Sequence, residues 1–262
     1  MKKAILITGI FMLLLAGFSS CYYEHGSIRG YGESMEFIVD LDYVTGIELD
    51  GSMDIEIIPS DSFKVVIVAQ ENIANAMVIE TVGDVAKVDY RSRLNVIPTD
   101  VAKVVFYMPE LYTVELDGSG DIYIDDDFET EENMQIKIDG SGNIDVEEII
   151  CNKLETTING SGNIEIGCVS NEVETIIRGS GNIGYYGSCG VHTIRIPGSG
   201  DVEAFDLFTE ETYIDISGSG DAFVWVENLL DIHISGSGDV TYKGNPQLNI
   251  DIPGSGNVIS WK

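Results

Sequence analysis

A short motif recurs along the chain and places a polar side chain at the same point of every copy. Gly-Ser-Gly is followed by Asp or Asn eight times, and three of the carboxylates are Asp201, Asp221 and Asp239. If the copies stack, these three lie one above another, where like charges repel unless a cation or hydrogen bonds compensate them. Oxygen ligands of this kind suit Ca²⁺. Asn and Asp also fit tight corners and bond neighbouring backbone amides. We therefore favour a structural role and keep calcium as the one candidate cofactor.

Residues for catalysis are few. With 44 Asp and Glu residues against 14 Lys and Arg, neighbouring acids are expected by chance and identify nothing. Enzymes that act on acidic polysaccharides need paired carboxylates or a base beside the uronate. Arg178 and Arg195 are better explained as partners of surface acids, and His192 and His233 occupy different positions in their repeats. The sequence therefore predicts no catalytic residue, no metal centre and no enzyme, with a polysaccharide lyase or hydrolase as the alternative.

Aromatic side chains at polar positions of the repeat are the remaining candidates for binding. Tyr123 and Phe223 each stand five residues after the first glycine of a motif, in a column expected to point outward. Tyr186, Phe205 and Trp225 stand seven residues after theirs, where the direction is harder to assign. Aromatic rings on a flat face suit sugar stacking or protein contact, and lateral packing of loops is the alternative.

Three cysteines lie within the repeats, at Cys151, Cys168 and Cys189. Their spacings of 17 and 21 residues are close to the repeat period, so the three can stack on one face. The spacing does not fit a zinc knuckle. An odd number leaves at least one thiol outside any disulfide within the chain. We expect stacked surface thiols and leave open whether any pair forms a disulfide.

The spacing of the motif defines the elements that carry these side chains. Its copies are 18 to 22 residues apart, and the positions two and four before it and four and six after it are mostly β-branched. This alternation predicts two short strands per repeat, joined at a Gly-Ser-Gly corner. Glycine suits such a corner because a tight bend needs positive φ or close backbone approach. The eight copies begin at Gly118, Gly140, Gly160, Gly179, Gly198, Gly218, Gly236 and Gly254.

Strands this short cannot bury their apolar stripe alone, whereas stacked repeats can. The sequence predicts an all-β fold with a parallel β-helix over residues 111–262, about 18–22 residues per coil, and one buried column that contains Ile138, Ile196, Ile216 and Ile234. A β-sandwich would show turn signals every ~8–12 residues, which this chain lacks. Residues 36–110 repeat weakly, with one degenerate copy at Gly51, and we expect a β-rich cap there.

The first 20 residues have the parts of an export signal: Lys2 and Lys3, an apolar run too short for a comfortable membrane span, and small residues before Cys21. A cysteine in this place is typical of a bacterial lipoprotein signal, although Phe18 stands where leucine is usual. We predict that residues 1–20 are a lipoprotein signal, that Cys21 is lipidated and that residues 21–35 form a tether. Because Tyr22 is not the aspartate of inner-membrane retention, the expected address is the outer membrane.

The net charge of −30 limits the classes of partner. Nucleic acid binding needs basic patches, which 14 Lys and Arg residues among 262 supply poorly. Electrostatic docking on anionic lipid is disfavoured for the same reason. We expect no nucleic acid partner and a membrane contact through the lipid anchor only.

The strand-rich segment from Phe37 to Pro109, followed by recurrences of Gly118-Ser119-Gly120-Asp121-Ile122, resembles the family of auto-transporter adhesin head GIN domains. The resemblance spans residues 35–261. It implies a right-handed β-helix in a cell-envelope lipoprotein of Bacteroidetes, with an adhesive role and no catalytic motif to carry over.

These observations together predict a non-catalytic envelope lipoprotein that binds a surface glycan or protein along one face of the rod. A long regular surface makes many weak contacts with an extended partner instead of enclosing it in one deep pocket. A carbohydrate-active enzyme and a purely structural envelope protein are the alternatives.

Overall fold

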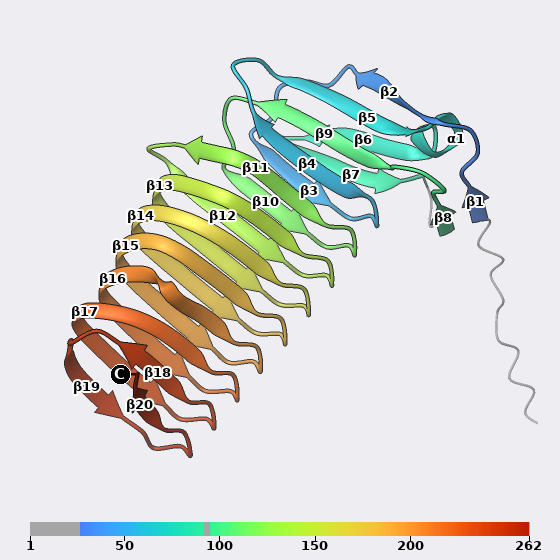
Figure 1. Ribbon diagram of the computed structural model, residues 1–262. Coiled ribbons are helices and arrows are strands. Elements are labelled where there is room, and N and C mark those ends of the chain that lie inside the picture. Colours follow the sequence, from blue (N-terminus) through green and yellow to red (C-terminus); the bar gives the residue numbers. More distant parts are fainter. Residues whose placement is uncertain (1–26, 92–94, 262) are drawn as a thin grey trace, which may run out of the picture.

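The computed structural model describes residues 27–91 and 95–261. They form a straight stack of β coils with a β-rich head at the N-terminal end (Figure 1). The predicted signal peptide, the lipidation site at Cys21 and the first part of the tether lie outside the described residues. Among the residues described, no helix has the length and apolarity needed to cross a bilayer.

Parallel strands build the stack, which confirms the predicted β-helix. A typical coil is one long, bent strand: β13 pairs through its first half with β11 and through its second half with β12. The strands are β10 (Thr113–Leu116), β11 (Ile122–Glu129), β12 (Asn133–Ile138), β13 (Ile144–Ile158), β14 (Ile164–Ile177), β15 (Ile183–Ile196), β16 (Val202–Ile216), β17 (Ala222–Ile234), β18 (Val240–Lys243), β19 (Gln247–Asp251) and β20 (Val258–Ser260).

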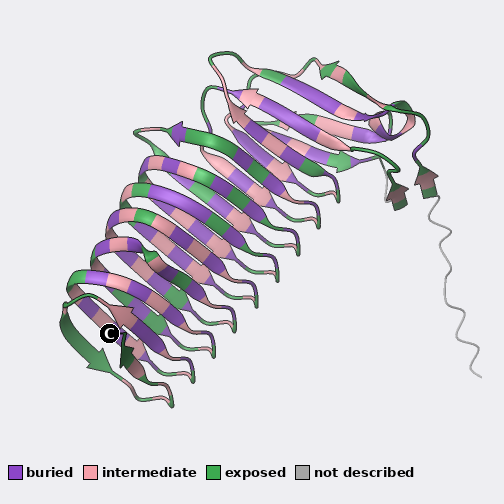
Figure 2. Cartoon of the chain, viewed as in Figure 1, coloured by how far each residue is buried: buried purple, intermediate pink, exposed green. Residues whose placement is uncertain are grey.

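The interior is a set of aligned apolar columns. Ile196 pairs in register with Ile216, and Ile216 with Ile234. These side chains and Ile138 are fully buried, as the sequence predicts. The alternation of buried and exposed residues along each coil is visible in Figure 2. Register therefore follows the hydrophobic pattern, because a shift of one residue would turn every isoleucine outward.

The Gly-Ser-Gly corners lie directly on one another. A Cβ atom on Gly218 would lie 1.9 Å from the carbonyl oxygen of Gly198 in the preceding coil, and the other corners repeat this contact. The positive-φ glycines of the described chain are elsewhere, at Gly32, Gly83, Gly187 and Gly244. Close approach of backbones, and not an unusual φ, is thus what requires glycine at the corners.

The degenerate motif at Gly51 does form a coil. β3 (Gly46–Leu49) and β4 (Asp54–Pro59) pair in parallel with β10 and β11. Beyond them, β7 (Val85–Tyr90) and β9 (Lys103–Met108) extend the stack in parallel, although they come later in the chain. The head is completed by antiparallel β2 (Ser34–Val39), β5 (Lys64–Gln70) and β6 (Met77–Val82), by helix α1 (Glu71–Ala74), and by the two-stranded pair β1 (Ser27–Arg29) and β8 (Asn95–Ile97).

Candidate functional site

The Asp and Asn residues after the corners form a hydrogen-bonded ladder. In each coil the side-chain Oδ1 accepts the backbone N–H of the ladder residue in the next coil, for example Asp201 Oδ1 from Asp221 and Asp221 Oδ1 from Asp239. The N···O distances are 2.7 to 3.1 Å from Asp54 to Asn257. An amide donor stabilises the charged form of a carboxylate, so the stacked aspartates have a partner that requires no cation.

Carboxylates gather in groups of three at another part of the rod. Within the described residues, Glu48, Asp50 and Asp117 form one group whose oxygens lie within 4.8 Å, and Glu115, Asp117 and Asp139 form another. Lys137 bonds both Glu115 and Asp139. The pKa of Asp117 is raised to about 6, first by desolvation and then by the acids around it. Calcium at Asp201, Asp221 and Asp239 stays a prediction.

A groove of about 680 Å³ lies over β14 to β17 and is lined by aromatic rings and carboxylates. Its residues are Glu165, Gly184, Tyr185, Tyr186, Glu203, Phe205, Asp206, Phe223 and Trp261. Three of these lining residues, Tyr186, Phe205 and Phe223, are aromatic positions that the sequence indicates as candidates for binding. Of the positions that the sequence suggests for binding, this groove gathers the most.

Two glycines, which have no side chain, make room for the groove and its lining. Glu165, Gly184, Glu203 and Phe223 occupy one outward column in successive coils. A Cβ on Gly184 would lie 2.1 Å from a carboxylate oxygen of Glu165, so the glycine leaves room for that side chain. Gly167 likewise leaves room for the ring of Tyr186, whose hydroxyl donates to the carbonyl of Glu147.

An insertion in β16 supplies two further groups. The register between β16 and β17 jumps between Ala204 and Phe208, so that Phe205, Asp206 and Leu207 have no partner in β17. Leu207 is fully buried, whereas Phe205 and Asp206 line the groove. A bulge of this kind redirects side chains. Its sequence signal is the step of 20 residues from Gly198 to Gly218, against 18 from Gly218 to Gly236.

The aromatic rings contact one another edge-on or at a tilt, and neither contact of Phe205 is a parallel stack. Phe205 lies 5.6 Å from Phe223 and 5.8 Å from Trp261, between ring centroids. The ammonium of Lys243 lies 4.4 Å from the centroid of Trp225 and 5.7 Å from that of Phe205, and it borders the cluster. Trp261 comes from the segment after β20, which the repeat pattern does not connect to Phe205.

The groove is lined by three carboxylates, and the ammonium of Lys243 lies at its border against the rings of Trp225 and Phe205. Among the described residues, no lysine or arginine forms an ion pair with Glu165, Glu203 or Asp206. The pKa of Glu165 is raised, first by desolvation and then by the charges of Asp145, Glu203 and Asp206. Arg195 pairs with the surface acid Glu174, as expected, whereas Arg178 donates to the amide oxygen of Asn159.

Tyr123 does not join the groove. It stands in the same outward column as Phe223, as predicted, because Tyr123 pairs with Asp145, Asp145 with Glu165, and so on to Phe223. Its side chain is 40% exposed on β11, and its hydroxyl lies near Asp121. The two predicted aromatics are therefore five coils apart and belong to different places on one face.

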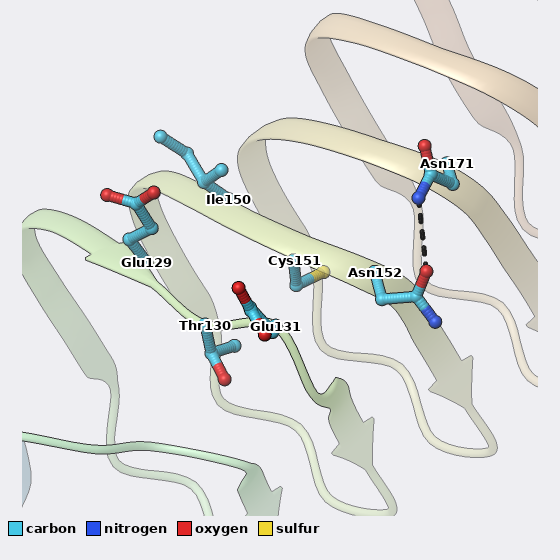
Figure 3. Close-up of a pocket in the computed structure, with 7 residues that line it drawn as sticks. All are labelled: Glu129, Thr130, Glu131, Ile150, Cys151, Asn152 and Asn171. Carbon is cyan, nitrogen blue, oxygen red and sulfur yellow. Dashed lines mark hydrogen bonds between the residues drawn. The ribbon is translucent and has the colours of Figure 1, made fainter.

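A second hollow of about 420 Å³ lies around Cys151 (Figure 3). Glu129, Thr130 and Glu131 border it, and Asn171 donates to Asn152 across 3.0 Å at its other side. Burial raises the pKa of the Cys151 thiol to about 11. Because the thiolate is the nucleophile, this shift lowers the nucleophilicity of Cys151 at neutral pH.

The expectation of surface thiols is wrong. Cys151, Cys168 and Cys189 are all free and buried. Cys151 and Cys189 share a column with Ser170 between them, and Cys168 lies two positions before that serine. Buried positions alternate along each coil, and small cysteines fill them as apolar residues do.

The interior also holds a polar cluster that the sequence does not identify as such. The hydroxyl of Tyr185 contacts Thr156 and lies 2.7 Å from Thr175 Oγ1, which lies 2.9 Å from His192 Nε2. His192 is fully buried and its Nδ1 has no partner. His233 is exposed and bonds Asp251, so the two histidines lie apart, as predicted. The cluster is closed to solvent and offers no site for a substrate.

The chain matches a known protein family, and its fold is similar to that of several solved structures. The family model described as "Putative auto-transporter adhesin, head GIN domain" matches residues 44–246. The crystal structure of a "Putative lipid binding protein" from Parabacteroides distasonis is 28% identical, with a TM-score of 0.84 over 90% of this chain and 100% of that one. A "putative adhesin" from Parabacteroides merdae is 21% identical, with a TM-score of 0.83 over the same shares. Among curated proteins, none has a sequence that matches this chain.

Proposed function

Because the chain belongs to the family of auto-transporter adhesin head GIN domains, we propose that it is a non-catalytic envelope protein that binds a surface glycan in the groove over β14 to β17. The observation that supports this most is the cluster of Phe205, Phe223 and Trp261 beside unpaired carboxylates. Aromatic faces stack on the apolar faces of sugar rings, and carboxylates accept hydrogen bonds from sugar hydroxyls.

The charge of the groove selects among glycans. Glu165, Glu203 and Asp206 repel uronates and sulfated sugars, and these three carboxylates outweigh the single charge of Lys243 at the border of the groove. We therefore expect a neutral or amino-sugar glycan. The face continues along the rod past Gly184 and Glu165, which suits an extended chain that makes several modest contacts.

A glycan array with the chain carrying Cys21→Ser tests the proposal. The variant Phe223→Ala removes one stacking face, and we expect about a tenfold loss of affinity, or about 1.4 kcal/mol. Tyr123→Ala is the matched control, because Tyr123 is an exposed aromatic of the same outward column outside the groove. Equal loss in both variants, or binding of acidic glycans only, contradicts the proposed site. Lipid vesicles form a second arm of the screen, since one similar structure is described as lipid binding.

A glycoside hydrolase is the second candidate, and one observation favours it. Glu165, with its raised pKa, lies near Glu203 in an aromatic groove, and glycosidases pair a protonated acid with a second carboxylate. Incubation with the glycans found on the array decides between the two functions. Turnover that Glu165→Gln abolishes supports the enzyme, whereas binding without turnover supports the adhesin.

A further inference from the structure

The groove over β14 to β17 holds two carboxylates on either side of a gap in one column. Glu165, Gly184 and Glu203 stand in register on the outward face of three successive coils. Gly184 has no side chain, and a Cβ atom there would lie 2.1 Å from a carboxylate oxygen of Glu165. The Glu165 carboxylate therefore lies over Gly184 and extends toward the coil of Glu203. Two like charges converge on the position where a side chain is missing.

The chain does not neutralise these charges. Among the described lysines and arginines, none forms an ion pair with Glu165, Glu203 or Asp206. Desolvation, and then the acids around it, raise the pKa of Glu165. Three carboxylates against the one ammonium of Lys243 leave two negative charges at the groove. A cation supplied by a ligand would relieve this repulsion.

A bare metal ion matches this arrangement less well than an organic cation does. Oxygen ligands of Ca²⁺ lie about 2.5 Å from the ion, and so within about 5 Å of one another. In the described part of the chain, the groups of three acids this close are those around Asp117, and the acids of the groove are not among them. An amine-bearing ligand brings N–H donors that reach separate carboxylates, and carbon atoms for the aromatic rings.

The rings beside the carboxylates are suited to a cation. Phe223 follows Glu203 in the same outward column. Phe205, next to Asp206 in the bulge of β16, lies 5.6 Å from Phe223 between ring centroids. The face of an aromatic ring attracts a positive charge, and the ammonium of Lys243 already lies 5.7 Å from the centroid of Phe205. An amine between carboxylate and ring gains an ion pair and a cation–π contact together.

We propose that the groove recognises protonated amino groups, carried by a glycan of amino sugars whose nitrogens bear no acetyl group. The glycan in this inference rests on the proposed function, whereas the recognition of amines has a test of its own. Each sugar ring of such a chain offers an apolar face to Phe223 and an ammonium to a carboxylate. Two negative charges remain at the groove, so the bound stretch carries two or more ammonium groups.

Oligomers of glucosamine and of N-acetylglucosamine of equal length test the inference, because they share a sugar backbone and differ in the charge on nitrogen. The chain carrying Cys21→Ser has two tryptophans, and since Trp261 lines the groove and Trp225 borders it, tryptophan fluorescence reports binding there. We expect the glucosamine oligomer to bind about tenfold more tightly at low salt, because hydrogen bonds between charged groups are the stronger ones. Added salt should reduce the difference.

Glu203→Gln and Glu210→Gln form a matched pair. Both residues are exposed acids of β16, and each substitution removes one charge from a chain of net charge −30, which attracts any polycation. Glu203 lines the groove and Glu210 does not. Glu203→Gln should weaken binding of the glucosamine oligomer about tenfold and leave the N-acetylated oligomer nearly unchanged. Glu210→Gln should affect neither, and circular dichroism shows whether both variants are folded.

Spermidine, which carries amino groups and no sugar ring, separates the inference from the proposed function. Equal affinity for the two oligomers, or equal weakening by Glu203→Gln and Glu210→Gln, overturns the recognition of amines and leaves a groove that binds glycans. If spermidine binds in a manner that Glu203→Gln weakens and neither oligomer binds, the amines are supported and the glycan is wrong. If none of the three probes binds, the inference is overturned.

Discussion

At the scale of the residue, the interior shows how one substitution in a column requires another. Thr156 and Thr175 stand where most repeats have isoleucine, and both are buried. Their hydroxyls are satisfied by Tyr185, which fills a core position of the neighbouring coil. The sequence pattern predicts that these positions are inside. It cannot predict the partners, because hydrogen bonds within the interior depend on side chains from three different coils.

His192 should make the stability of the protein depend on pH. Burial lowers its pKa to about 3, from an ordinary value of about 6.5. Between these values the unfolded chain binds a proton that the folded chain does not. The contribution of His192 to the pH dependence is therefore zero above pH ~6.5. Below that pH the free energy of unfolding falls, by up to about 1.4 kcal/mol per pH unit. Denaturant unfolding of wild type and His192→Leu at several pH values measures this difference.

Thr212→Val is the control for that experiment, because Thr212 is the buried neighbour of His192 in the same column and has no titrating group. It should change the free energy of unfolding by the same amount at every pH. A His192→Leu variant whose stability falls with acid as steeply as that of wild type would show that His192 is not the titrating group.

At the scale of the element, the coil is predictable and its irregularities are not. Period-two alternation around a recurring corner determines the strands and their register, so the columns around Ile216 follow from the sequence alone. The groove arises from departures from that pattern: Gly184 in an outward column, and the extra residues from Phe205 to Leu207 in β16. Repeat length records the insertion, but which residue it turns outward depends on how the strand bends.

Gly218→Ala should be far more costly than an ordinary substitution in a turn. Its Cβ would lie 1.9 Å from the Gly198 carbonyl oxygen, so the two coils would have to separate. Overpacking against side chains costs about 1–3 kcal/mol, and a backbone contact relaxes less easily, so we expect a loss of about 3 kcal/mol or more. Ser219→Ala, one residue on, keeps the backbone bond to Gly198 and should cost less than ~0.5 kcal/mol. Thermal or denaturant unfolding compares them, and equal losses would contradict the explanation by close approach.

At the scale of the whole molecule, the fold and the location depend on different parts of the chain. The family match over residues 44–246 and the parallel stack agree with the sequence-based fold. The predicted signal, residues 1–20, and the lipid anchor at Cys21 lie outside the described residues. Charge also bears on how the protein is held at the membrane. Removal of residues 1–20 takes away two lysines and no acid, so the net charge of the remaining chain is −32 instead of −30.

Cys21→Ser should therefore move the protein entirely from the membrane to the soluble fraction. A rod of such negative charge is repelled by anionic lipid head groups, and no helix of its described residues can span the bilayer. Only the acyl chains on Cys21 would hold it at the membrane. Fractionation with labelled fatty acid measures this, with Tyr22→Ser as a control that keeps the anchor. Because Cys21→Ser can also block removal of residues 1–20, a second variant carries an ordinary cleaved export signal, and its persistence in the membrane fraction would contradict the lipid anchor.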